Sequence, residues 1–365
     1  MGNSKPVFAY VGCYTAERVP PDRFVPAQGA AKGIRVFRVG PAGWELLQEV
    51  EQANPMYLLF GPKNRTLYAA SSDTNRVWAY RVDPETGLLS VLNHQEIDGK
   101  STLCLSLSPD GRYLIVGAMS GTMASIRLAE DGSLGQVCDQ FSLPGERGPL
   151  RDEQPFPRPH HCPFDPQGRF CFVLDKGADA VDAYRLDPET GRLTLSGRLQ
   201  TRPGSIPRHI AFHPDGNWAY LNTEHIGTVV SCRLEGETGQ LVPFQILPTI
   251  PEDYVGNYSL SSEIWMHPNG RWLYVSNRGH DSIALFSVDG ENGRLKTVGW
   301  QSTLGEIPRY FAIEPGGRRL YACNQKSGEI REFSIDPSDG TLAFTGLTVE
   351  TPTPVWLLFS GEVSW

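Results

Sequence analysis

One pattern recurs along almost the whole chain and constrains the fold more than any other feature. An apolar run is followed by a turn of the Pro-x-Gly type and then by a second apolar run with Leu-Tyr or a similar pair, as in IPRHIAFHPDGNWAYLNT from Ile206. The turn prolines of the copies are Pro62, Pro109, Pro166, Pro214, Pro268 and Pro315. They lie 47 to 57 residues apart, and repeats near this period predict a propeller or a solenoid.

The segments between the copies also have the pattern of paired strands. Each contains an alternating apolar run, a turn with glycine and another apolar run, as in VWAYRVDPETGLLS and VDAYRLDPETGRLT. This arrangement is typical of a β-hairpin. Each repeat unit therefore contains four strands, which is the content of one propeller blade.

The two ends of the chain supply one further blade between them. The segment VFAYVGCY from Val7 matches a second strand, whereas PVWLLF from Pro354 matches the first strand PMYLLF from Pro55. Pairing the last strand with the first three closes the ring and removes exposed sheet edges. We therefore predict an all-β, seven-bladed β-propeller with four antiparallel strands per blade. It forms a single domain over residues 1–365, with one blade split between 7–50 and 353–361.

The composition excludes several classes of function. The 33 Lys and Arg against 41 Asp and Glu give a net charge of -8 without a basic run, so no nucleic-acid partner is expected. No stretch approaches the roughly 20 apolar residues of a membrane helix, and no apolar signal core follows Met1. The 7 cysteines lack metal-ligand spacing and are expected to be buried thiols. We expect a cytoplasmic protein without metal or other cofactor, as a monomer or weak homo-oligomer.

Three segments lengthen loops of the repeat, at residues 16–31, 141–159 and 248–261. The first follows a blade's second strand, and the other two link one blade to the next. In an up-and-down blade these loops emerge on the same face. Long loops gathered on one face of a rigid scaffold usually carry function, although drift in unconstrained loops is an alternative.

The repeat allows equivalent positions of different blades to be compared. Two positions, six residues before the turn proline and ten residues after it, are predicted to lie near the central axis at the long-loop face. In the first three blades they are mostly apolar: Val355, Met56, Leu103, Tyr14, Ser72 and Met119. In the other four blades they are polar: His160, Lys176, Arg208, Glu224, Ser262, Arg278, Arg309 and Gln325.

This one-sided gathering of charge predicts a pocket for an anionic small molecule. A pseudo-symmetric scaffold has no structural need for ionisable groups on one side of its axis. Arginine suits bidentate contacts to carboxylate or phosphate, and His160 and Glu224 are available for proton transfer. Arginine near His160 disfavours the charged imidazole. The alternative is a set of inter-blade salt bridges, for example Arg208 with Glu224, and a histidine bonded to backbone.

The motifs, taken in order, resemble the lactonase family of seven-bladed propellers. That family includes the propeller-type 6-phosphogluconolactonase and the fungal 3-carboxy-cis,cis-muconate cyclase. The matching segments are YVGCYT from Tyr10, PH at Pro159 with DPQG from Asp165, PRHIAFHP from Pro207, NTE from Asn222, SSE from Ser261, LYVSNRG from Leu273 and IPR from Ile307. The resemblance implies an active site of His160, Arg208, Glu224 and Arg278. The family often has Pro-His-x-His, whereas Arg158 replaces the first histidine here, which adds a cation near the mouth.

The leading hypothesis is hydrolysis of a sugar lactone that carries phosphate or carboxylate. His160 or Glu224 would activate water, and Arg208 and Arg278 would stabilise the oxyanion. The candidate substrate-binding residues are Lys176, Arg309, Gln325, Glu263 and Arg158. A muconate-type cycloisomerase or lactone isomerase in the same pocket is one alternative, and a non-enzymatic binding scaffold is another.

Three further polar residues stand one place along the innermost strands, namely His161, His209 and Glu263. Strict alternation predicts that they point to the other face of their strands, against neighbouring blades. We expect hydrogen-bonded core groups there, with Glu263 the first of the three to reassign to the site. His213 and His267 precede turn prolines and are expected to serve the turns.

Overall fold

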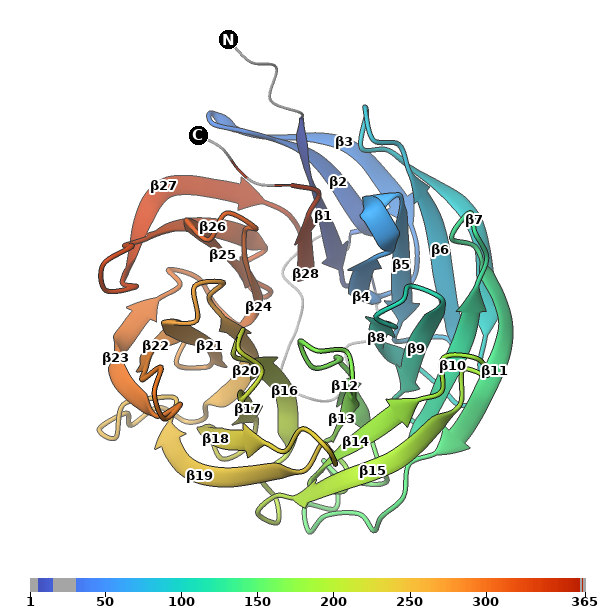
Figure 1. The fold of residues 1–365 in the computed structure, drawn as a ribbon. Helices are drawn as coiled ribbons and strands as arrows, with labels where there is room; N and C mark the ends of the chain where they lie inside the picture. The colour runs from blue at the N-terminus through green and yellow to red at the C-terminus, as the bar shows by residue number, and fades with distance from the viewer. Residues whose placement is uncertain (1–5, 16–30, 362, 364–365) are drawn as a thin grey trace.

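The computed structural model describes residues 6–15, 31–361 and 363. Seven four-stranded antiparallel sheets surround a central axis (Figure 1), which confirms the predicted propeller. Within the described ranges the only helix is a single 3-10 turn, η1 (Pro62–Asn64). None of the helical structure there has the length and apolar character needed to cross a bilayer.

Each blade contributes one strand to each of four concentric positions. The innermost strands are β28 (Pro354–Phe359), β4 (Pro55–Phe60), β8 (Thr102–Leu107), β12 (Pro159–His161), β16 (Pro207–Phe212), β20 (Leu260–Met266) and β24 (Pro308–Ile313). The second strands are β1 (Val7–Cys13), β5 (Thr66–Ser71), β9 (Tyr113–Ala118), β13 (Cys171–Asp175), β17 (Trp218–Thr223), β21 (Trp272–Arg278) and β25 (Arg319–Asn324). The third strands are β2 (Gly33–Gly40), β6 (Arg76–Val82), β10 (Thr122–Leu128), β14 (Ala180–Leu186), β18 (Thr228–Leu234), β22 (Ser282–Val288) and β26 (Glu329–Ile335). The outermost strands are β3 (Gly43–Glu51), β7 (Leu89–Glu96), β11 (Leu134–Ser142), β15 (Leu193–Gln200), β19 (Leu241–Pro248), β23 (Leu295–Ser302) and β27 (Leu342–Glu350).

The ring closes through the split blade, as the sequence predicts. The sheet order β28-β1-β2-β3 places the last strand of the chain beside the first, with Tyr10 opposite Leu358. Figure 1 shows β28 next to β1 at the inner end of this blade. Because the closing strand comes from the other end of the chain, every blade has a neighbour on both sides and the inner edges are covered.

A tyrosine of the second strand joins several blades to the next. The Tyr10 hydroxyl donates to the carbonyl of Gly87 at 2.8 Å, in the hairpin turn of the following blade. The bond from Tyr274 to Gly340, at 2.7 Å, is equivalent. Gly87 has a φ of 75°, and a Cβ there would lie 2.4 Å from the ring of Phe8. Only glycine fits that backbone conformation and that space.

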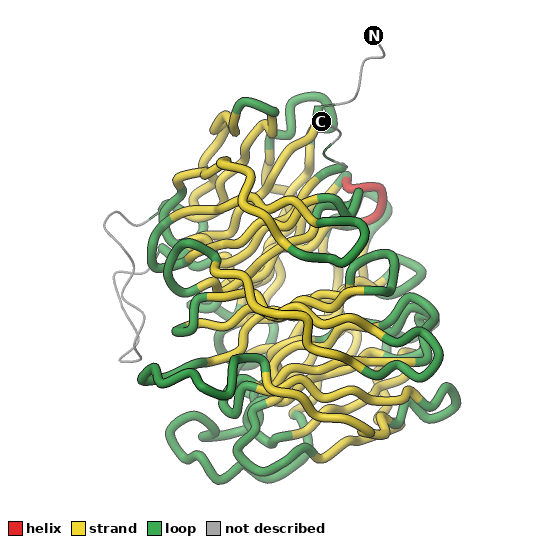
Figure 2. Tube along the Cα trace, turned by 90° about the vertical axis from the view of Figure 1, so that its left-hand side faces the viewer, coloured by secondary structure: helices red, strands yellow, loops and turns green. Residues whose placement is uncertain are grey.

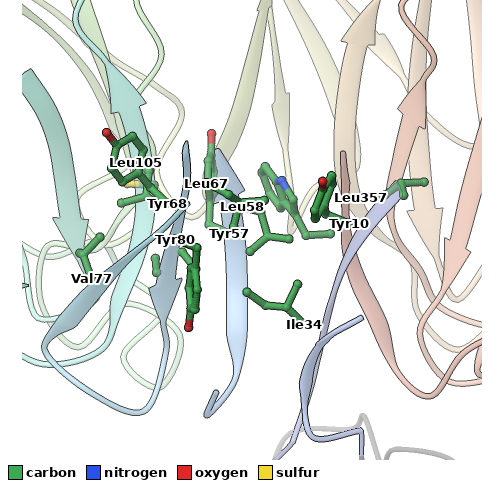
Figure 3. Close-up of a cluster of buried hydrophobic side chains, with 14 of the residues drawn as sticks. Tyr10, Ile34, Tyr57, Leu58, Leu67, Tyr68, Val77, Tyr80, Leu105 and Leu357 are labelled. Atoms are coloured by element: carbon green, nitrogen blue, oxygen red, sulfur yellow. The ribbon is translucent and has the colours of Figure 1, made fainter. Parts of the chain in front are cut away.

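Apolar packing between blades forms the core. Every residue of β1 and β5 is buried, whereas in an outer strand such as β23 only Leu295 is buried and the other residues alternate between exposed and partly exposed. Figure 3 shows side chains of neighbouring blades packed together, among them Leu58 of β4, Leu105 of β8 and Leu357 of β28, each no more than 1% exposed. These contacts fix the angle between blades and thereby the position of the axis.

Two of the three predicted long segments are links between blades. β11 and β12 are joined by residues 143–158, and β19 and β20 by residues 249–259. The side view in Figure 2 shows loops at both faces of the ring, with η1 in red marking the face of the Pro-x-Gly turns. The segment predicted at 16–31 lies almost wholly outside the described residues.

Candidate active site

Every innermost strand contains a β-bulge near its start. In β16, Pro207 pairs with Thr223 but His209 pairs with Asn222, so Arg208 is an extra residue. The other six innermost strands show the same kind of register shift. A bulge interrupts the alternation of a strand and re-aims its side chains. Consecutive residues of these strands can therefore both face the axis.

A small cavity lies where these side chains meet. Its volume is about 10 Å³, close to what one water molecule needs. It is lined by Met56, Tyr57, Leu103, His160, Arg208, His209, Glu263, Arg309, Tyr310, Val355 and Trp356. The prediction that His209 and Glu263 point away from the axis is wrong, because the bulge adds one residue before them. A polar pair at consecutive positions, such as Arg208 with His209, was the signal for this arrangement.

One side of the axis is apolar. Met56, Leu103 and Val355, from three consecutive blades, form a buried cluster, and Tyr14 and Met119 pack against it. These are residues from both sets of equivalent positions compared in the sequence. The structure thus brings the apolar positions of the first three blades into one patch.

On the other side, three cations surround the carboxylate of Glu224. Arg278 donates to Glu224 Oε1 at 2.6 Å, Lys176 contacts Oε2, and the Nε of Arg208 lies 3.8 Å from Oε2. Arg208 also donates to the carbonyl of Ser262 at 2.6 Å. Glu224 is 9% exposed, Arg208 3% and Arg278 2%. Three cations around one carboxylate leave the group with excess positive charge.

Burial and mutual charge displace the pKa values of this cluster. Burial alone would raise the pKa of Glu224, but Lys176, Arg278 and Arg208 outweigh it and hold the pKa well below its usual range. Burial, with the charges of Arg158 and Arg208, lowers the pKa of Lys176 to about 7, although Glu224 acts in the opposite direction. Burial and Arg278 lower the pKa of Arg208 to about 9, so its guanidinium stays charged at neutral pH.

His160 is the outer end of a buried hydrogen-bond chain. Its Nδ1 lies 3.0 Å from Nε2 of His209, and Nδ1 of His209 lies 2.8 Å from Oε1 of Glu263. Burial, followed by the charges of Arg208 and Lys176, holds the pKa of His160 well below its usual range. The imidazole is therefore uncharged at neutral pH, as expected from the neighbouring arginine.

Glu263, at the inner end of the chain, is almost completely buried. It is 2% exposed, and the backbone N–H of Ile264 donates to its Oε1 at 2.9 Å. Its Oε2 has no hydrogen-bond partner among the described residues. Burial raises the pKa of Glu263 to about 8, against the opposing charge of Arg208. Glu263 therefore exchanges a proton near neutral pH.

The remaining predicted residues lie around this centre. Arg309 lines the cavity, and its guanidinium lies 5.6 Å from the ring centroid of Tyr14, at the border with the apolar side. Arg158 is half-buried and donates to the carbonyl of Glu153 at 2.9 Å, and its charge still lowers the pKa of His160. Gln325 is buried, and its side-chain oxygen has no hydrogen-bond partner in the described ranges.

Two of the arginines at bulge positions, Arg208 and Arg309, follow a residue with an unfavourable backbone conformation that hydrogen bonds hold in place. Ile206 and Ile307, each two residues before an arginine, have φ values of 58° and 60°, which are unfavourable for β-branched residues. Carboxylates fix both, since Asp179 accepts from Ile206 N–H and Asp281 from Ile307 N–H, each at 2.8 Å. The Ile206 carbonyl in turn accepts the N–H of Glu224 at 2.8 Å. This network ties the start of the innermost strand to the end of the second.

The alternative of inter-blade ion pairs is realised as well. Glu224 follows β17, whereas Lys176 follows β13 and Arg278 ends β21, so these two contacts of the carboxylate cross to neighbouring blades. The pair of Arg208 with Glu224, expected between blades, lies within one blade, because β16 and β17 belong to the same sheet. His160 is not bonded to backbone in the described contacts but to His209. Ion pairing and a site for an anion thus use the same residues.

The expected role of two histidines before the turn prolines can be compared with the structure. His213 and His267 bond to the carbonyls of Gly270 and Gly317 in the turns of the next blades, at 3.1 and 2.7 Å, so they do serve the turns. Among the described residues no group of three or more His, Cys, Asp or Glu has the arrangement of a metal site.

A larger surface hollow of about 680 Å³ lies on the link between β11 and β12. None of the predicted site residues lines it.

Comparison with known proteins places the chain in a family. The family model described as "Lactonase, 7-bladed beta-propeller" matches residues 8–359. The chain belongs to this family. A 6-phosphogluconolactonase of Bacillus subtilis is 33% identical over 360 residues, covering 97% of this chain and 98% of the relative. A 6-phosphogluconolactonase of Formosa agariphila is 29% identical over 295 residues, covering 77% of this chain and 82% of the relative.

Solved structures agree with this assignment. The periplasmic gluconolactonase of Pseudomonas aeruginosa shares 32% identity and a TM-score of 0.86, over 97% of this chain and 99% of that one. The predicted resemblance, the fold and the prediction of a lactonase-family enzyme are thereby confirmed. The roles of individual residues, the oligomeric state and the cytoplasmic location stay predictions.

Proposed function

We propose that this protein hydrolyses a sugar lactone that carries phosphate or carboxylate, at the axial site of His160, Arg208, Glu224 and Arg278. One observation carries the proposal: an uncharged imidazole stands beside cations that outnumber their one carboxylate. The names of the relatives support lactone hydrolysis, since 6-phosphogluconolactonase is among them.

His160 acts as the general base in this proposal. A neutral imidazole can take a proton from water as the water attacks the ring carbonyl, and the cavity beside it has about the volume of one water. Glu224 is less suited, because three cations hold its pKa far below neutral pH and make it a weak base. We assign to Glu224 the positioning of Lys176, Arg208 and Arg278.

The cations divide between the reacting carbonyl and the acid group of the substrate. Arg208 and Arg278 stabilise the oxyanion, for which removal of one donor typically costs about 100- to 1000-fold in rate. Lys176 and Arg309 bind the phosphate or carboxylate, with Arg158 attracting it at the mouth. The lactone ring lies above the cavity, which is too small for it, and Gln325 is the candidate partner for a sugar hydroxyl.

The test uses purified protein with freshly prepared 6-phosphogluconolactone and with unphosphorylated gluconolactone. Acid release is followed above the spontaneous rate, which it should exceed for the phosphorylated lactone. His160→Gln should lower kcat/KM by about 100-fold or more, whereas His225→Gln, at an exposed histidine, should not. Failure to accelerate either lactone rejects the proposal, and loss of muconate absorbance instead would favour the cycloisomerase.

We further propose the cytoplasm as the location and a monomer or weak homo-oligomer as the state. All seven cysteines are free, and six of them are buried, as in proteins of reducing compartments. The relative from Pseudomonas aeruginosa is periplasmic, so fractionation of the native host is the appropriate measurement.

A further inference from the structure

We propose that Glu263, His209 and His160 form a proton relay, in which the proton taken from the attacking water ends on Glu263. The inference rests on the proposed lactone hydrolysis for its substrate, but the relay itself is a property of the free protein. It gives a role to His209, which the sequence pattern placed outside the site, and a proton-accepting role to Glu263, which was a candidate for substrate binding.

The geometry is a continuous line of ring nitrogens and a carboxylate oxygen. His160 and His209 meet at 3.0 Å, and His209 and Glu263 meet at 2.8 Å. His160 is 8% exposed, whereas the two inner groups are less exposed, His209 at 1% and Glu263 at 2%. Only the outer end of the relay is therefore accessible to a substrate above the cavity.

The surrounding backbone holds the line in position. The bulge in β16 leaves the N–H of His209 without a strand partner, and the side chain of Asn222 accepts it at 2.9 Å. The N–H of Glu263 is accepted by the side chain of Ser276 at 3.0 Å. Both bulged segments thus have their donors satisfied by side chains of the adjacent strand, which limits movement of the two groups.

The proton balance requires no other reactant. When the water O–H bond breaks, the proton binds Nε2 of His160, and the proton on Nδ1 of His160 passes to Nε2 of His209. The proton on Nδ1 of His209 passes to Glu263, which becomes a neutral acid. The negative charge lost at Glu263 appears on the lactone oxyanion beside Arg208 and Arg278. In the reverse direction the relay protonates the ring oxygen as its bond to the carbonyl carbon breaks.

The chemistry of the three groups favours this endpoint over a charged imidazole. Burial, followed by Arg208, depresses the pKa of both histidines, whereas burial raises the pKa of Glu263 to about 8. A proton entering at His160 is therefore more stable on Glu263. The unpartnered Oε2 of Glu263 also costs less free energy in a neutral acid than in a carboxylate.

The titratable groups around Glu263 do not change their charge over the pH range in which Glu263 loses its proton. The titratable or charged groups that act on Glu263, or on which it acts, are Arg208 and His209 of β16, Tyr310 of β24, Tyr57 of β4 and Cys323 of β25. Burial raises the pKa of Tyr310, Tyr57 and Cys323 well above their usual values, so all three are neutral. Arg208 is the one cation in this set, and it stays charged while Glu263 titrates.

The first test needs no variant and no substrate. Nitrogen NMR of ¹⁵N-histidine-labelled protein reports the protonation of each ring nitrogen between about pH 6 and pH 9. The relay predicts that His160 and His209 stay neutral and change together from the Nε2–H to the Nδ1–H tautomer as Glu263 loses its proton. A charged imidazole on either ring, or tautomers that do not change, would overturn it.

The second test uses Glu263→Gln, which keeps the size of the side chain but cannot accept the relayed proton. Wild-type kcat should rise with pH up to about 8, because the relay accepts protons only when Glu263 is ionised. The variant should lose this rise and about 100-fold or more in kcat. A variant that keeps the wild-type pH profile would overturn the relay.

The matched control is His161→Gln. His161 occupies the same strand position as His209 in the preceding blade, and its ring stacks on His209 at 4.4 Å, but it lies outside the hydrogen-bond line. The control should keep the rise with pH, and thermal unfolding of each variant checks that it is folded. If wild type hydrolyses no lactone, the proposed function fails, while the NMR result still decides the relay.

Discussion

The two sides of the axial site occupy equivalent positions of one repeat but differ in chemistry. In the first three blades these positions form the buried cluster of Met56, Leu103 and Val355. In the later blades the same strand position is occupied by His160 and Arg208, which line the same cavity. The backbone does not explain the difference, because the bulge occurs on both sides.

The comparison separates what the fold requires from what function requires. An apolar cluster at the axis gains free energy from burial, so the propeller closes without any charge there. The charged side costs desolvation free energy even when its groups are paired. That cost is visible in Lys176, whose pKa falls to about 7, and in Glu263, whose pKa rises to about 8. Perturbed pKa values gathered on one side of the axis are typical of a functional site.

The largest expected effect comes from making the charged side resemble the apolar one. Arg278→Met introduces the residue type of Met119, which occupies the equivalent position. Because an oxyanion donor is lost, kcat/KM for 6-phosphogluconolactone should fall by about 100- to 1000-fold. Arg271→Met, at an exposed arginine of a turn, is the control. A decrease no larger than that of the control would contradict the assignment of Arg278.

A smaller effect should appear in the pH dependence of substrate binding. Lys176 is charged below its pKa of about 7 and loses its charge as the pH rises above that value. KM for a phosphorylated lactone should therefore increase above pH 7, by up to about ten-fold per pH unit, while KM for unphosphorylated gluconolactone should not follow it. Lys176→Arg keeps the charge and should flatten the increase. Parallel KM profiles for the two lactones would show that Lys176 does not bind the acid group.

The smallest effect is expected on the apolar side. Leu103→Met nearly conserves side-chain volume, so the free energy of unfolding should fall by less than about 1.5 kcal/mol. The residue lines the cavity but offers no polar group, so kcat/KM should be unchanged. Thermal unfolding and initial rates measure the two quantities. A loss of rate comparable to that of Arg278→Met would mean that both sides of the axis take part in the reaction.

Comparison of the repeats within the sequence was sufficient to predict the ring of blades and part of the site. The turn prolines and the match between the strands at Pro354 and Pro55 predict the closure that pairs β28 with β1. Register alone brought Lys176, Arg208, Glu224 and Arg278 into one cluster. These predictions succeed because a repeat places equivalent residues at equivalent distances from the axis.

The hydrogen-bond line from His160 to Glu263 could not be predicted in this way. Alternation along a strand is a local rule, and it assigned His209 and Glu263 to the wrong face. The bulge that reverses this assignment is a feature of strand pairing, which depends on how β16 meets β17. Two consecutive polar residues at the start of an innermost strand, such as Arg208 and His209, are the sign in the sequence that both side chains reach the axis.

The amino-acid sequence by itself determined the architecture and the charge of one side of the axis, because both follow from the repeat and from residue type. Tertiary structure alone decided which charges pair and which proton positions are connected. Glu224 meets Arg278, and His209 meets Glu263, from separate blades. Hydrogen bonds depend on the distance and direction between two atoms, and only the packed ring of blades sets these.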